Sequence, residues 1–173
     1  MRGAELQALG AKLTREGDRV TLVDLGHTRA DDAAMRHVAE LRELTELRIQ
    51  STRVTDDGVA ALASLTHLAR LNLSNTAVGD VGLASLAALS GLVQLRAAGL
   101  RVTDAGLQSL AGLQQLGELH LNDTRVGDAG LVHLEGMSQL RLLVINRTRV
   151  TAAGVKKLQG VLPLLVVQHQ RRG

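Results

Sequence analysis

The stretch LTELRIQSTRVTDDGVAALASL, residues 44–65, contains the pattern that decides the fold. Its first half alternates apolar and polar residues over 47–49, which is typical of a short strand with one buried face. Its second half places Val59, Leu62 and Leu65 at the spacing of one helical face. The stretch therefore predicts a strand, a turn and a short helix.

This pattern recurs along the chain with a period of 24 residues, and no insertion breaks the register from residue 20 onward. We number the positions of each unit from one, starting at Val20. The first position is occupied by Val20, Leu44, Leu68, Leu92, Leu116, Leu140 and Leu164. One unit cannot bury its own apolar stripe, whereas stacked units share a continuous core. The period therefore predicts a stacked repeat array.

The array is predicted to be an α/β solenoid, with parallel strands along the concave face and short helices along the convex face. Because helices are wider than strands, the stack is expected to curve into a horseshoe arc. We expect an N-terminal cap over residues 1–19, which contains a helix and a turn or edge strand. Six repeats follow over residues 20–163, and residues 164–173 form a final half-repeat strand and a tail.

Two residue types recur at the start of the predicted helices. An Asp stands at the thirteenth position of most units, as Asp32, Asp56, Asp80, Asp104 and Asp128. It is expected to accept hydrogen bonds from the first turn of its own helix, together with the Thr or Asp before it. The fifteenth position holds Gly58, Gly82, Gly106, Gly130 and Gly154. Gly inside a helix costs about 1 kcal/mol against Ala, so its recurrence predicts close packing between neighbouring units that excludes a side chain.

The consensus Leu-x-x-Leu-x-Leu-x-x-Thr-x-Val-Thr-Asp-x-Gly-Leu-x-x-Leu resembles the leucine-rich repeat, in the 24-residue variety common in bacterial proteins. The clearest copies are residues 44–65 and 116–134, and the resemblance covers residues 20–169. The resemblance implies a right-handed solenoid whose main role is to bind other proteins.

The ninth position of the units departs from the best-known form of that family, which has Asn there to bond backbone groups in the turn. This chain has Thr28, Thr52, Thr76, Thr124 and Thr148 at that position. A Thr hydroxyl can bond the same backbone groups. Leu100 in the fourth unit cannot, so a looser turn is expected there.

The composition excludes several kinds of chemistry. The chain has 173 residues, of which 45% are hydrophobic, and it contains no Phe, Tyr, Trp or Cys. Disulfides, Cys-ligated metals and thiol catalysis are therefore excluded. The net charge is +3, from 20 Lys and Arg against 17 Asp and Glu, which is far below that of a dedicated nucleic-acid binder. No apolar run approaches the roughly 20 residues of a membrane span, so we expect a soluble, cytoplasmic protein.

One group of side chains suggests chemistry: Glu118, His120 and Asn122 alternate along one predicted strand and share its open face. These side chains could in principle bind a metal or move a proton. A zinc site needs three or four close ligands, and no second His lies nearby in register. We therefore interpret the group as part of a hydrated binding surface, and we expect no enzyme activity, no metal and no cofactor.

The concave strand face is formed by the third and fifth positions, which vary in charge from unit to unit while the core positions stay aliphatic. A frame alone does not require that variety, so this face is predicted to bind a partner. The candidate residues are Arg48, Arg70, Asn72, Gln94, Arg96, Glu118, His120 and Asn122. Two ion pairs, Asp24–Arg48 and Glu46–Arg70, are expected because neighbouring strands lie about 4.8 Å apart.

A second feature is a row of Arg at the tenth position, which we call the arginine rim. It consists of Arg29, Arg53, Arg101, Arg125 and Arg149, with Ala77 interrupting the row. One interpretation is structural, with each Arg paired to an Asp that opens a nearby helix. The other is functional, with Arg53, Arg101, Arg125 and Arg149 contacting an acidic partner.

Together these features predict a non-enzymatic protein–protein interaction module, whose concave face and arginine rim bind another protein with an acidic surface. One alternative is binding of nucleic acid or another polyanion through the rim. The lack of aromatic side chains removes base stacking and disfavours nucleic acid. Another alternative is a structural role, as a monomer or with weak self-association through the C-terminal edge.

Overall fold

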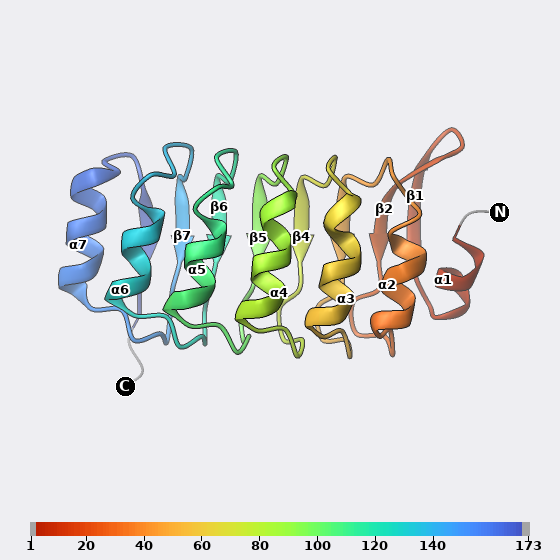
Figure 1. Ribbon diagram of the computed structural model, residues 1–173, viewed down its shortest axis with the longest axis horizontal. Coiled ribbons are helices and arrows are strands. Elements are labelled where there is room, and N and C mark those ends of the chain that lie inside the picture. Colours follow the sequence, from red (N-terminus) through yellow and green to blue (C-terminus); the bar gives the residue numbers. More distant parts are fainter. Residues whose placement is uncertain (1–2, 171–173) are drawn as a thin grey trace.

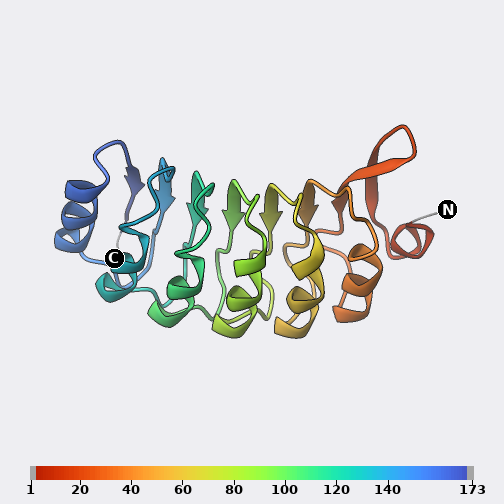
Figure 2. The ribbon, with the colours of Figure 1, turned by 45° about the horizontal axis from the view of Figure 1, so that its top comes forward.

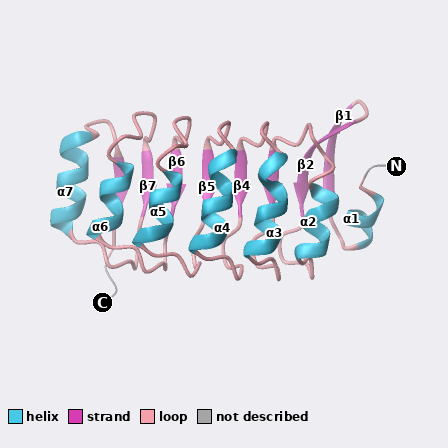
Figure 3. Ribbon diagram, viewed as in Figure 1, coloured by secondary structure: helices cyan, strands magenta, loops and turns pink. Residues whose placement is uncertain are grey.

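The computed structural model describes residues 3–170. Within that range the chain is a stack of strand–turn–helix units, with strands along one side and helices along the other (Figures 1 and 3). In the rotated view the helices lie on the outer side of a shallow arc and the strands on its inner side (Figure 2). The predicted curved α/β solenoid is confirmed, with parallel strands on the concave face and helices on the convex face.

The described residues contain one sheet of eight strands, arranged in chain order. After helix α1 (Ala4–Ala8), strand β1 (Lys12–Glu16) pairs antiparallel with β2 (Arg19–Asp24). The other strands pair in parallel and are β3 (Glu46–Arg48), β4 (Arg70–Asn72), β5 (Gln94–Arg96), β6 (Glu118–His120), β7 (Leu142–Val144) and β8 (Val166–Gln168). Equivalent positions face each other, as Leu47 pairs with Leu71, so the sheet keeps the register of the sequence repeat.

Short helices cover the convex side of the sheet. They are α2 (Asp32–Val38), α3 (Asp56–Ala60), α4 (Asp80–Ser85), α5 (Asp104–Leu110), α6 (Asp128–Leu131) and α7 (Ala152–Val161). Short 3₁₀ segments continue three of them, at Ala61–Ser64, Leu86–Ala88 and Val132–Leu134. Helices this short are held by packing against the core more than by their own backbone bonds.

Rows of aliphatic side chains fill the space between strands and helices. The first-position residues Leu44, Leu68, Leu92, Leu116 and Leu140 are all completely buried, as are Leu47, Leu95, Leu119 and Leu143 of the strands. At the C-terminal end, in contrast, Leu164 is 69% exposed and Val166 is 59% exposed. Within residues 3–170, that end of the stack therefore presents apolar surface beside β8, the last strand of the described sheet. The predicted division of the chain into residues 1–19, 20–163 and 164–173 stays a prediction.

The turn after each strand is fixed by the eighth and ninth positions. The eighth residue adopts a left-handed conformation at His27, Ser51, Asn75, Gly99, Asp123 and Arg147. The ninth-position hydroxyl donates to the carbonyl three residues earlier, as Thr52 Oγ1 does to Ile49 at 2.7 Å. The same bond recurs at Thr28, Thr76, Thr124 and Thr148. The role predicted for these Thr side chains is confirmed.

The looser turn expected in the fourth unit is not seen. The N–H of Gly99 donates to the Asn122 carbonyl at 2.8 Å, the same length as the equivalent bond from Asn75 to Ala98. Leu100 is only 3% exposed and packs in the core cluster. Core packing by Leu100 therefore takes the place of the missing hydroxyl bond.

The thirteenth-position carboxylates bond the next unit, which corrects the expectation that they cap their own helices. Asp80 Oδ1 accepts from the Thr103 N–H at 2.8 Å, and Asp80 Oδ2 accepts from the Thr103 hydroxyl at 2.7 Å. Asp32 and Asp128 bond Thr55 and Thr151 in the same way. Asp56 and Asp104 accept from backbone N–H groups of the next unit, where Gly79 and Gly127 replace the Thr. We call these five residues the aspartate ladder. Capping within the same helix comes instead from Asp31, Thr103 and Thr151.

The recurring fifteenth-position Gly makes room for this ladder. A Cβ atom added at Gly58, Gly82, Gly106, Gly130 or Gly154 would lie under 3.0 Å from Oδ1 of the Asp in the preceding unit. The predicted close packing between units is therefore confirmed, and its partner is the aspartate carboxylate. Among the described residues, no helix is both long and apolar enough to cross a membrane.

Candidate partner-binding surface

Three-residue strands place the side chains of the candidate surface. In each strand the middle residue, such as Leu71 or Leu95, points into the core, and the residues on either side of it lie on the concave face. The parallel register then brings Arg48, Arg70, Asn72, Gln94, Arg96, Glu118 and His120 together on β3 to β6. These are seven of the eight residues predicted for the concave face. Asn122 lies beyond the end of β6.

Glu46 is the centre of the first charged cluster on this face. Its carboxylate accepts from Arg48 Nε and from Arg70 Nε, both at 2.7 Å. Arg48 also lies 3.7 Å from Asp24, so both predicted ion pairs are present. Burial alone raises the pKa of Glu46, but the hydrogen bonds and charges of Arg70 and Arg48 outweigh it and lower that pKa from its ordinary value.

Glu118 is the centre of the second cluster, two strands further along. Gln94 Nε2 donates to Glu118 Oε2 at 2.6 Å, and Arg96 lies 3.6 Å from Oε1. His120 Nε2 contacts the same Oε1 atom. Burial again raises the pKa of Glu118, but the bonds from Gln94 and His120 and the charge of Arg96 outweigh it and lower the pKa.

A hollow of about 430 Å³ lies on the concave face between the two clusters. Its lining includes Glu46, Arg48, Arg70, Asn72, Gln94 and Arg96. These six side chains are polar, and three of them, Glu46, Arg48 and Arg70, are bonded to each other. A hollow lined in this way is suited to a polar side chain. Within residues 3–170, no three His, Asp or Glu side chains are grouped so that they could hold a metal ion.

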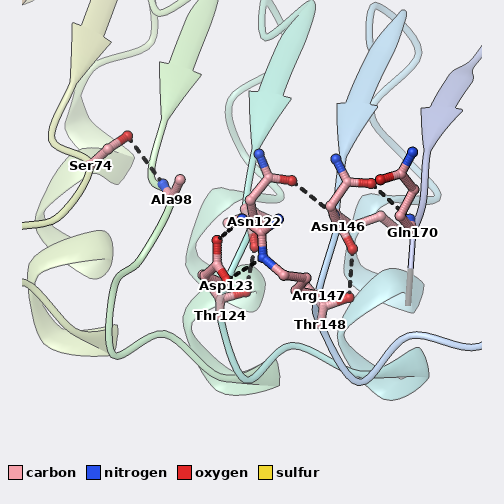
Figure 4. Close-up of polar contacts among 11 residues, drawn as sticks. Ser74, Ala98, Asn122, Asp123, Thr124, Asn146, Arg147, Thr148 and Gln170 are labelled. Atoms are coloured by element: carbon pink, nitrogen blue, oxygen red, sulfur yellow. Dashed lines mark hydrogen bonds and ion pairs between the residues drawn. The ribbon is translucent and has the colours of Figure 1, made fainter. Parts of the chain in front are cut away.

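Asn122 takes part in the turn rather than in the Glu118 cluster. Its Oδ1 accepts from the Asn146 N–H at 2.8 Å, and Asn146 Oδ1 accepts from the Gln170 N–H at 2.7 Å. Figure 4 shows these side chains side by side at the ends of neighbouring strands. The seventh position therefore links units, and the recurrence of Asn at 122 and 146 was the sequence signal for that role.

The arginine rim runs along the turns that follow the strands. From the second unit on, each tenth-position N–H donates to the carbonyl of the eleventh residue in the preceding unit, as Arg125 does to Val102 at 3.0 Å. The side chains of Arg29, Arg53, Arg101, Arg125 and Arg149 are exposed. No ion pair involves any of these five side chains in the described part of the chain. The structural interpretation, pairing with the Asp residues at the helix starts, is therefore not seen.

Two features were missed at the sequence level. One is the aspartate ladder, whose signal was the joint recurrence of Asp at the thirteenth position and Gly at the fifteenth. The other is an exposed ion pair between neighbouring turns, in which Arg147 Nε donates to Asp123 Oδ1 at 2.6 Å. The hydrogen bond and charge of Asp123 raise the pKa of Arg147. The sequence repeat does not predict this pair, because a different residue type occupies the eighth position in every unit.

The comparisons with known proteins agree with this geometry. Residues 41–63 and 64–87 match the family model for the leucine-rich repeat. A search of the curated proteins gives no match. The match covers two of the repeats, and the fold of the chain is that of a leucine-rich-repeat solenoid.

Two solved structures with this fold are internalins of Listeria monocytogenes. One internalin (inlF) has a TM-score of 0.67 and 22% identity, with 80% of this chain and 38% of that chain covered. Internalin C2 has a TM-score of 0.61 and 20% identity, with 89% of this chain and 74% of that chain covered. At these identities the likeness concerns the fold. The aligned part of this chain covers 38% of the length of the first of these internalins.

Proposed function

We propose that this protein is a non-enzymatic interaction module, which binds another protein through its concave face and its arginine rim. One observation carries the proposal: side chains of varied charge are presented in fixed positions on a repeated aliphatic frame. Curved repeat stacks offer extended concave surfaces of this kind for binding. The leucine-rich repeat and its internalin-like fold support the same general role.

The partner that fits best is a protein with an acidic surface. Arg is one of the three residue types that most often dominate binding energy at protein interfaces, and Tyr and Trp, the other two, are absent from this chain. On the concave face we assign the contacts to Arg48, Arg70, Asn72, Gln94, Arg96, Glu118 and His120. Asn122 contributes through the turn that it holds.

The preformed ion pairs support recognition rather than catalysis. Arg48 and Arg70 are held by Glu46 before any partner arrives, so less side-chain freedom is lost on binding. The proposal places the protein in the cytoplasm and assigns it no metal and no cofactor.

The test is a cross-linking pull-down from the native host, comparing the wild-type chain with Arg48→Glu, Arg70→Glu and Arg96→Glu combined. We expect the partner to be lost from the triple variant. A matched control reverses three exposed charges away from this face, at Arg36, Arg42 and Lys156. Equal recovery of the partner by both variants and the wild type would refute the proposal.

A further inference from the structure

The charged side chains on the concave face are already paired with each other. Asp24 and Glu46 face Arg48 and Arg70, while Glu118 faces Arg96. Counting these six side chains, three negative charges meet three positive ones. An approaching acidic partner therefore meets a nearly neutral face, and its carboxylates would compete with internal ones that already hold the guanidinium groups.

The arginine rim differs from the concave face because its side chains are exposed and form no internal ion pairs among the described residues. Its five side chains are exposed, and within residues 3–170 none forms an ion pair. The carboxylates of the aspartate ladder follow the rim positions by three residues and accept from backbone groups of the next unit, as Asp56 does from Gly79 and Gly82. In the described part of the chain, the rim guanidinium groups are therefore not held by an internal ion pair and can turn toward a partner.

The rim also has a regular geometry. Backbone bonds between units join its positions at Arg53, Ala77, Arg101, Arg125 and Arg149, with N···O distances from 2.9 to 3.2 Å. Successive positions are thus about one strand spacing apart, roughly 4.8 Å. Three Arg in consecutive units, at residues 101, 125 and 149, form the longest uninterrupted part of the row.

We propose that the arginine rim binds an extended acidic segment of the partner protein, which lies across the repeats and places its carboxylates on Arg101, Arg125 and Arg149. This inference rests on the proposed function and adds a division of roles. The rim supplies charge attraction, and the nearly neutral concave face contacts the remainder of the partner.

The dimensions fit an extended peptide. Alternate side chains of an extended chain lie on one side, about 6.6 Å apart. Rim positions lie about 4.8 Å apart, and a long Arg side chain can span the difference of roughly 2 Å. A planar guanidinium group can also hold a carboxylate through two hydrogen bonds, which a Lys ammonium cannot.

The composition favours an acidic peptide over a nucleic acid. Single-stranded nucleic acids are held by aromatic side chains as well as by charge, and this chain contains none. Its net charge of +3 also gives little long-range attraction for a phosphate backbone.

Ala77 allows a test that adds a contact instead of removing one. Its side chain is exposed and its N–H donates to the Val54 carbonyl at 3.0 Å, as the rim Arg residues do in their own units. Ala77→Arg therefore joins the two parts of the rim without disturbing the core.

The experiment measures fluorescence anisotropy of a labelled ten-residue poly-glutamate peptide with the full chain at low salt. We expect Arg101→Ala, Arg125→Ala and Arg149→Ala combined to weaken binding by about tenfold or more, because three exposed charge contacts are lost. Ala77→Arg is expected to tighten binding by about two- to fivefold. The control is Arg36→Ala, Arg42→Ala and Lys156→Ala, which removes the same charge elsewhere and should leave the affinity within about twofold.

Three results would overturn the inference: equal affinity of the rim variant and the wild type, no gain from Ala77→Arg, or tighter binding of a labelled ten-nucleotide oligothymidylate than of the peptide. The pull-down with the concave-face variant is a separate measurement. If the concave-face variant loses the partner in the pull-down while the rim variant keeps its peptide affinity, the proposed function stands and the role of the rim is refuted. If the concave-face variant keeps the partner while the rim variant binds the peptide more weakly, binding through the concave face is refuted and binding through the rim stands.

Discussion

The aspartate ladder makes a prediction about how neighbouring units hold each other. Asp80→Ala removes two charge-assisted hydrogen bonds, to the Thr103 N–H at 2.8 Å and to its hydroxyl at 2.7 Å. A hydrogen bond to a charged group contributes about 1.5–3 kcal/mol, and a half-buried site lies near the lower value. We therefore expect Asp80→Ala to lower the free energy of unfolding by about 3 kcal/mol.

The same contact predicts the behaviour of Gly106. A Cβ added there would lie under 3.0 Å from Asp80 Oδ1, so Gly106→Ala forces the carboxylate away and should cost about 1–3 kcal/mol. When Asp80 is already Ala, that clash is gone and only the contact with Val102 at 3.2 Å remains. Ala is then favoured over Gly in the helix by about 1 kcal/mol, so the same substitution becomes neutral or stabilising.

The assay is urea unfolding followed by circular dichroism, on the wild type, both single variants and the double variant. The expected coupling energy is at least about 1 kcal/mol in favour of the double variant. Asp57→Ala is the matched control, because Asp57 is also an acidic residue in the first turn of a helix but is exposed. It should cost under about 1 kcal/mol, which is the usual size of a charge–helix dipole interaction. Additive effects at Asp80 and Gly106 would refute the reasoning.

Three further outcomes are expected. The pKa of Glu46 is lowered in the folded chain from its ordinary value of 4.5, so its stabilising effect is present above that pH and is lost as the pH falls. Acid titration of the unfolding free energy should therefore show a smaller decline below pH 4.5 for Glu46→Gln than for the wild type; parallel curves would contradict this. Leu95→Ala should cost about 2–5 kcal/mol by creating a cavity in a fully buried row, while Leu164→Ala, at a side chain 69% exposed, should cost under about 1 kcal/mol. Light scattering should detect weak self-association that Val166→Asp abolishes, since Val166 is 59% exposed on β8, the last strand of the described sheet; monomer mass for the wild type at high concentration would exclude it.

The period of the sequence predicted most of the fold. Because every unit has the same length, Leu47, Leu71 and Leu95 had to face each other, and the parallel register followed directly. The same register placed Arg48 beside Asp24 and Arg70 beside Glu46, so the ion pairs of the concave face could be predicted without coordinates.

The sequence did not predict the contacts of polar side chains that can choose between two hydrogen-bond partners. An Asp at a helix start can accept from its own first turn or from the next unit, and the pattern alone favours the first choice. The second is realised because Gly at the fifteenth position leaves space for the carboxylate. Asn122 posed the same problem, since alternation placed it on the open face while its Oδ1 bonds the Asn146 N–H in the next unit.

The direction of the aspartate ladder has a consequence for how such a chain lengthens. A block of residues 104–127 contains one residue of the aspartate ladder, Asp104, and, at Gly127, the N–H that this Asp binds at 2.6 Å. If that block were copied in tandem, each new carboxylate would find its receiving N–H inside the same copy, and Gly130 would still accommodate the last one. Duplication of a whole repeat therefore adds length to the arc without requiring any compensating substitution, whereas insertion of a partial repeat breaks a ladder contact at once.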